Sequence, residues 1–160
     1  MRNTMNINPI KFGYTTTLTK LWKEGKLPEF VKGFYGDILS HDPKSPQYAS
    51  NVHLQPHSKG GKTSLYNIVL SSAENNNRRG NDPLTTVFDK HNAEEYLKQF
   101  EGLKVEYKKG NKIKMFNGDS YAENIRQTIK QILNREGSYA LADSLTETAK
   151  QVGKNLDIIG

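Results

Sequence analysis

Two short apolar segments, separated by a loop rich in Pro and Gly, constrain the fold more than any other feature of the chain. Residues 52–54 form the first segment, which stops at Pro56, because a residue without an N–H cannot serve a central strand. Gly60 and Gly61 suit a flexible turn. Residues 65–70 form the second segment and include β-branched side chains. The pattern predicts two short strands joined by a loop.

A short helix is predicted directly after the second strand, over residues 73–79. Ser72 is a favourable N-cap residue, and Gly80 suits the left-handed conformation that often follows a helix. Three consecutive asparagines lower the intrinsic helix propensity of this stretch. The expected order is therefore strand, loop, strand and short helix.

Helices and one hairpin are predicted around this unit. The apolar residues recur at helical spacing in four segments, residues 17–25, 93–100, 121–135 and 140–156, with Asn92 as the N-cap of the second and Trp22 as a core anchor in the first. Residues 104–116 alternate and turn at Gly110-Asn111, which predicts a hairpin. Residues 1–14 show no period and are expected to form an arm. At 160 residues, the chain should form one α+β domain, with a central unit over residues 34–84 and a mainly helical extension over residues 92–160.

The composition favours a protein that binds a polyanion. The net charge is +6 and the pI is about 9.4, which makes nucleic acid the first partner to consider. The absence of Cys excludes disulfides and Cys-based zinc sites, and fits a reducing compartment. No apolar run reaches 18 residues and no signal segment is evident, so we expect no membrane contact and a cytoplasmic location. The many Asn and Lys residues suit a bacterial or phage source but indicate no function.

Several catalytic motifs are excluded by their spacing. The triplet Gly61-Lys62-Thr63 ends a phosphate-binding loop motif, but that motif needs Gly where this chain has Pro56. No G-x-S-x-G elbow is present for a serine hydrolase. The four His residues do not show the H-E-x-x-H spacing of a zinc-binding helix.

One spacing stands out, and it spans both predicted strands and the helix. Its members are His53, Pro56, Gly60-Gly61, Asn67, Leu70, Asn76 and Arg79-Gly80. In this order the sequence resembles the HNH endonuclease family. The ββα-metal site of that family has a strand ending in an acidic residue and His, a Pro, a Gly pair, an Asn on the second strand, and then Asn or His followed three residues later by Lys or Arg. The resemblance covers about residues 34–84 and implies an HNH-like ββα unit flanked by N-terminal and C-terminal helices.

The resemblance implies a metal-dependent endonuclease that hydrolyses DNA phosphodiester bonds. His53 would be the general base that takes a proton from the attacking water, a task that suits a near-neutral pKa. Asn76 would offer its side-chain oxygen to a divalent cation, Mg²⁺ or Mn²⁺, that stabilises the negative charge developing on the phosphate. Glu74 is a further candidate ligand of that cation.

The resemblance also implies supporting roles. Asn67 would form hydrogen bonds within the loop and keep His53 correctly oriented. Arg79 would either hold a phosphate or stabilise the short helix. Lys59 and Lys62 lie on the predicted loop, where they would contact the DNA backbone independently of sequence.

The chain departs from the family at the residue before His53. The family usually has a metal-binding Asp or Glu there, whereas this chain has Val52, which binds no metal. Three interpretations stay open: another carboxylate, such as Glu74, Asp82 or Asp37, reaches the metal; the fold is used without catalysis; or Val52 is itself a substitution.

Other interpretations lead to functions without catalysis. A catalytically silent HNH-like protein would bind nucleic acid or inhibit a protein partner that processes it. A basic adaptor would use the helical region after Gly137. The five lysines over residues 104–114 form either a solvated face or a strip contacting DNA, with Tyr107 and Phe116 as stacking groups. His57 is expected to be a solvated loop residue.

Overall fold

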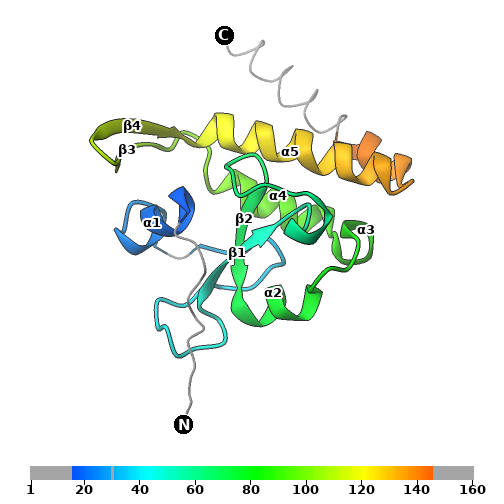
Figure 1. The fold of residues 1–160 in the computed structure, drawn as a ribbon, viewed down its shortest axis with the longest axis horizontal. Coiled ribbons are helices and arrows are strands. Elements are labelled where there is room, and N and C mark those ends of the chain that lie inside the picture. The colour runs from blue at the N-terminus through cyan, green and yellow to red at the C-terminus, as the bar shows by residue number, and fades with distance from the viewer. Residues whose placement is uncertain (1–15, 30, 146–160) are drawn as a thin grey trace.

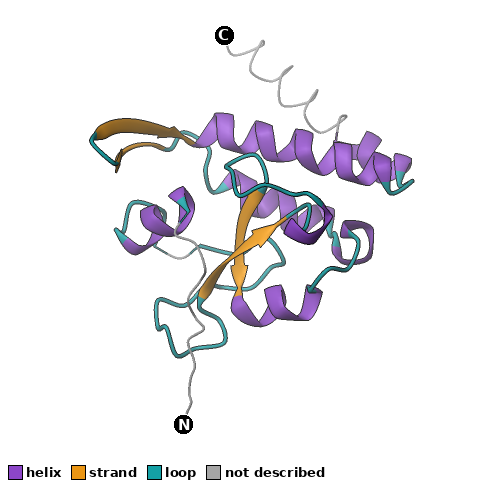
Figure 2. Cartoon of the chain, in the orientation of Figure 1, coloured by secondary structure: helices purple, strands orange, loops and turns teal. Residues whose placement is uncertain are grey.

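The computed structural model describes residues 16–29 and 31–145, and its fold class is α+β, as expected (Figures 1 and 2). Residues 139–145 are also helical, whereas the predicted arm over residues 1–14 and the rest of the predicted last helix lie outside the described residues. The elements are α1 (Thr17–Lys23), β1 (Ala49–His53), the 3₁₀ turn η2 (His57–Lys59), β2 (Ile68–Ser72), α2 (Ala73–Arg79), α3 (Leu84–Val87), α4 (Lys90–Lys98), β3 (Lys104–Lys109), β4 (Lys112–Asn117) and α5 (Gly118–Arg135).

β1 and β2 form a two-stranded antiparallel sheet at the centre of the molecule (Figure 2). Val52 lies opposite Val69, and His53 at the end of β1 lies opposite Ile68 at the start of β2. The second strand begins later than predicted, because the backbone N–H groups of Asn67 and Ile68 both donate to the carbonyl of Ser64, at 2.9 and 3.0 Å. A turn therefore replaces the first residues of the predicted strand.

Two tyrosines take the place of a third strand beside β2. The backbone N–H of Leu70 donates to Tyr96 Oη at 3.0 Å, and Tyr121 Oη donates to the carbonyl of Ile68 at 2.8 Å. The two hydroxyls are 2.8 Å apart, and burial raises the pKa of both. Because unpaired backbone groups are costly in a core, these neutral phenols stabilise the sheet edge and attach α4 and α5 to it.

The helices after residue 92 are thus part of the core rather than an appendage to it. Buried residues of α4, α5 and the segment over residues 139–145 belong to the same apolar cluster as those of α1 and the central sheet. Trp22 is buried in this cluster, at 3% exposed, and stacks on His41 with ring centroids 3.8 Å apart. The prediction that Trp22 is a core anchor is confirmed.

Two helix starts differ from the prediction. Asp89, not Asn92, is the N-cap of α4, because its side-chain oxygen accepts a hydrogen bond from the N–H of Asn92 at 2.8 Å. α5 begins at Gly118, three residues earlier than expected, and is capped by Asn117. A Cβ on Gly118 would lie 1.8 Å from the carbonyl oxygen of Phe100, so this close crossing requires glycine.

β3 and β4 form the predicted hairpin, which extends away from the central sheet (Figure 1). Gly110 lies in the turn with a φ of 63°. Tyr107 and Phe116 pack into the core and are 8% and 2% exposed. They cannot stack on nucleic-acid bases, which corrects the role considered for them. Within the described residues, no helix combines the length and apolar character that crossing a membrane requires.

Candidate functional site

The side chain of Asn67 closes the loop between β1 and β2. Its Oδ1 accepts a hydrogen bond from the N–H of Gln55 at 2.8 Å. Its Nδ2 donates to the carbonyls of Gln55 and Lys62, at 3.1 and 2.9 Å. Asn67 is 7% exposed, and these three bonds join the end of the first strand to the far side of the loop. Asn67 therefore forms hydrogen bonds within the loop, as expected, and its role in orienting His53 stays a prediction.

The glycine pair lets the loop pass close to Asn67. Gly60 has a φ of 90°, a left-handed conformation that favours glycine. A Cβ on Gly61 would lie 1.7 Å from the carbonyl oxygen of Gln55 and 2.9 Å from Asn67 Nδ2. The Gly-Gly spacing therefore has a local structural cause, namely the space that the buried amide requires.

His53 is the titratable group that this loop holds in place. Its Nε2 lies 2.9 Å from the hydroxyl of Thr63, which directly follows the Lys62 carbonyl bound by Asn67. Burial, together with the nearby His57, lowers the pKa of His53 below its usual value. At neutral pH the imidazole is therefore mainly unprotonated, which is the state that a general base requires.

α2 covers the outer edge of β1 through two side chains one helical turn apart. Asn76 Nδ2 donates to the carbonyl of Asn51, and Arg79 Nη1 to the carbonyl of His53, at 2.9 and 2.8 Å. In an antiparallel pair, alternate residues direct both backbone groups away from the partner strand. Asn51 and His53 are such residues. Asn76 and Arg79, which are three residues apart on α2, therefore reach two carbonyls that are two residues apart on β1.

The environment of Arg79 favours the structural role considered for it over a phosphate-binding role. Its guanidinium also donates to the carbonyls of Leu54 and Asp82, at 2.9 and 3.1 Å. The residue is 4% exposed. Its cation is therefore used to hold α2 and the following turn against the end of β1, and it presents little surface to a substrate.

A pocket of about 440 Å³ lies where β1, η2 and α2 meet, and it brings His53 and Asn76 together. Asn76 Nδ2 bonds the hydroxyl of Ser50 as well as the Asn51 carbonyl. Because a carbonyl can only accept, these bonds fix the orientation of the amide. Asn76 Oδ1 accepts no hydrogen bond from any residue that the structure describes. The other residues that line the pocket are Asn51, Pro56, His57, Ser58, Arg79, Gly80 and Asn81.

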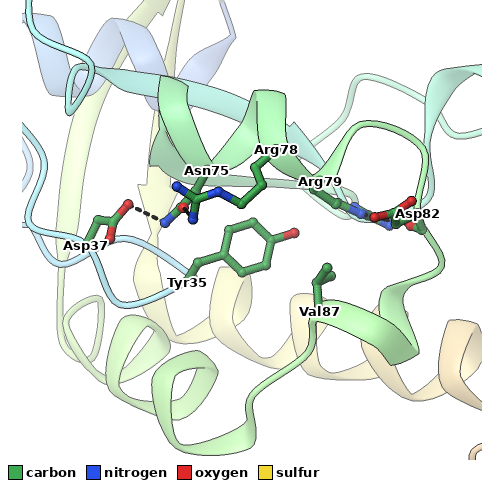
Figure 3. Close-up of a pocket in the computed structure, with 7 residues that line it drawn as sticks. All are labelled: Tyr35, Asp37, Asn75, Arg78, Arg79, Asp82 and Val87. Atoms are coloured by element: carbon green, nitrogen blue, oxygen red, sulfur yellow. Dashed lines mark hydrogen bonds between the residues drawn. The ribbon is translucent and has the colours of Figure 1, made fainter.

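The three carboxylates considered as replacement ligands do not line this pocket. Asp37 and Asp82 line a second pocket beside α2, where Asp37 bonds Asn75 and Asp82 lies beside Arg79 (Figure 3). Glu74 pairs with Arg78 at 2.9 Å near the protein surface. The interpretation in which one of them reaches a cation beside His53 is not supported by this arrangement.

Val52 is a core residue of β1, and its side chain lies on the opposite face of the strand from those of Asn51 and His53. Alternate residues of a strand share a face, so Val52 is on the same face as Ser50, whose hydroxyl contacts Asn76 of α2. Val52 is 0% exposed and belongs to the hydrophobic core. An apolar side chain therefore stands, inside the core, at the position where the resemblance to the HNH family leads one to expect a carboxylate.

The residues present do not fit a site for Mg²⁺ or Mn²⁺. Hard divalent cations bind carboxylate oxygens, and Mg²⁺ sites normally include at least one. The pocket lining contains two imidazoles and three amides but no carboxylate. In the described part of the chain, no group of three His, Asp or Glu side chains is arranged to hold a metal. No catalytic step is therefore derived through a cation.

Two residues near His53 were not predicted from the sequence to belong to the site, and the two lysines expected to contact DNA are exposed. Thr63 contacts His53, but the sequence drew attention to it only as part of a rejected phosphate-loop motif. His57 is exposed on the loop, as expected, yet it lines the pocket with its ring centroid 6.2 Å from that of His53. Lys59 and Lys62 are exposed on the same loop, where a phosphate can reach them.

Comparisons of the chain with protein-family models, with curated proteins and with solved structures found no match.

Proposed function

We propose that this protein is an HNH-type endonuclease that hydrolyses phosphodiester bonds of DNA, with His53 as the general base. The observation that supports this most strongly is the pocket shared by His53 and Asn76, at one end of a strand–strand–helix unit. Both side chains lie on elements that hydrogen bonds hold in a defined relation. Their order along the chain is the one on which the resemblance to the HNH family rests.

In this mechanism the neutral imidazole of His53 accepts a proton from water as that water attacks the phosphorus. The phosphorus–oxygen bond to the water forms, the phosphorus–oxygen bond to the leaving sugar oxygen breaks, and that oxygen takes a proton from solvent and leaves as a hydroxyl group. The contact with Thr63 orients the imidazole, and Asn67 fixes the loop from which Thr63 projects. Lys59 and Lys62 are exposed on the same loop and bind phosphates of the DNA backbone without reading sequence.

The experiment is a plasmid-cleavage assay with Mg²⁺, with Mn²⁺ and with EDTA. We expect nicking by the wild-type protein and a loss of about 10²- to 10⁴-fold in rate for His53→Ala, the usual range for removing a general base. His91→Ala is the matched control, because His91 is exposed on α4 and does not line the pocket. Cleavage that survives in His53→Ala rejects the assigned mechanism.

A second candidate function is that of a catalytically silent HNH-like protein, which binds nucleic acid or inhibits a protein partner that processes it. The burial of Val52 and the absence of a carboxylate from the pocket lining favour this candidate. It predicts binding without cleavage in every metal condition. Nicking by the wild-type protein that is lost in His53→Ala would exclude it.

A further inference from the structure

The β3–β4 hairpin carries positive charge that its own fold does not require. In the antiparallel register Lys109 lies directly opposite Lys112, at the end that projects from the molecule. Like charges in directly opposed positions destabilise a strand pair. Lys114 lies on the same face, opposite Tyr107, whose ring is buried toward the base of the hairpin. This face is therefore apolar at its base and basic at its tip.

The opposite face of the hairpin is open to solvent and combines basic with apolar side chains. Lys108 lies opposite Ile113, and Glu106 lies opposite Met115. Ile113 is 66% exposed and Met115 is 54% exposed. Lys104 is also on this face. Exposed apolar side chains flanked by lysines on a projecting two-stranded ribbon indicate a contact surface rather than part of a core.

The segment around α1 adds cations along the free edge of β3. Lys20 Nζ donates to the carbonyl of Lys108 at 2.6 Å, and Lys26 Nζ donates to the carbonyl of Glu106 at 2.9 Å. These bonds also fix the direction of the hairpin relative to α1. Together, residues 17–26 and 104–117 contain eight lysines and two glutamates, a net charge of +6 that equals the net charge of the whole chain.

We propose that this hairpin and the adjoining α1 bind the phosphate backbone of duplex DNA, at a surface separate from the His53 pocket. A polyanion complements a surface that carries the full net charge of the protein. A duplex fits the hairpin better than a single strand, because single-strand binding relies on aromatic stacking and both aromatic rings of the hairpin, those of Tyr107 and Phe116, are buried. A two-stranded β-ribbon also has the dimensions of the DNA major groove.

A groove links this surface to the loop that follows the His53 pocket. It has a volume of about 320 Å³, and its lining includes Tyr66 of the loop and Met115 of β4. Tyr66 is 60% exposed and lies next to Asn67, the residue that fixes the loop. The choice of DNA as the ligand rests on the proposed function, and the groove places β4 of the ribbon beside Leu65 and Tyr66, which follow the loop lysines along the chain.

The test measures binding of a fluorescent 30-base-pair duplex to the full chain carrying His53→Ala, in EDTA, over a range of salt concentrations. In that background, Lys109→Gln with Lys112→Gln is compared with Lys44→Gln with Lys90→Gln, which makes the same change in charge outside the hairpin. We expect the hairpin pair to weaken binding roughly tenfold or more at 0.1 M salt and to reduce the salt slope by about 0.9 for each phosphate that the variant no longer binds. The control pair should change both quantities much less.

Three outcomes would overturn the proposal: equal effects of the two pairs, tighter binding of a single strand of the same length, or binding of an acidic protein with no binding of DNA. Thermal melts of both pairs establish that the variants are folded. Failure of the proposed function is recognised separately. If the hairpin variant weakens duplex binding but the wild-type protein cleaves no plasmid, the binding surface is retained and the proposed hydrolase activity is rejected. If the wild-type protein cleaves plasmid but the hairpin variant binds the duplex normally, the hydrolase activity is retained and the binding surface is rejected.

Discussion

Replacing Asn67 by Ala should destabilise the protein far more than the loss of one polar side chain normally does. The change removes three hydrogen bonds to backbone groups of Gln55 and Lys62 and leaves those groups partly buried. At a net value of about 1 kcal/mol for each bond, the free energy of unfolding should fall by about 3 kcal/mol. For a domain of this size, that corresponds to a decrease in Tm of roughly 6 to 12 °C.

Urea and thermal denaturation followed by circular dichroism measure this loss. Asn77→Ala is the matched control, because Asn77 is exposed on α2 and alanine favours a helix. Its free energy of unfolding should change by no more than about 0.5 kcal/mol. A loss below about 1 kcal/mol for Asn67→Ala would refute the conclusion that its amide closes the loop.

Three further predictions concern the same unit. Gly61→Ala should lower the free energy of unfolding by about 3 kcal/mol, because the new Cβ meets the Gln55 carbonyl. Gly110→Ala should lower it by only about 1 kcal/mol, because nothing lies near its Cβ and only the φ of 63° is unfavourable. Urea titrations that give equal losses for the two variants would contradict the packing described. Val52→Asp should be less stable than wild type, and more so at pH 8 than at pH 5. A carboxylate buried in the core has a raised pKa, so the variant loses less stability as pH falls and the carboxyl group becomes protonated; a decrease in Tm relative to wild type that is equal at the two pH values would contradict this. If His53 is the general base, the cleavage rate should rise with pH through a pKa below 6.5 and level off above about pH 7, and a rate that still rises beyond pH 8 would exclude that assignment.

The sequence predicted the elements whose signals are local. Ser72 caps α2, which spans the predicted residues, because the hydroxyl accepts from the N–H of Asn75 at 3.1 Å. Gly80 follows with a φ of 52°, but its ψ of −123° lies outside the left-handed helical region expected for it. The hairpin turns at Gly110-Asn111, as predicted, because the alternation of side chains on both strands and the turn-forming residues indicate the same position.

The environments of the site residues could not be predicted, because they depend on contacts between distant segments. Arg79 ends a helix and is exposed by default in a sequence-based view, yet it is buried against the carbonyls of His53 and Leu54. Tyr96 and Tyr121 are 25 residues apart and meet only because both bind the edge of β2. Nothing in the local sequence distinguishes these tyrosines from aromatic residues that simply lie on the apolar face of a helix.

The most direct test of the central proposal is the single-turnover rate at which supercoiled plasmid is nicked by wild-type protein and by the His53→Ala variant. The proposal predicts nicking by the wild type in at least one of three conditions, Mg²⁺, Mn²⁺ or EDTA, and a rate lower by a factor of about 10² or more for His53→Ala. Equal rates for the two proteins, or no nicking by the wild type in Mg²⁺, Mn²⁺ or EDTA, would contradict it.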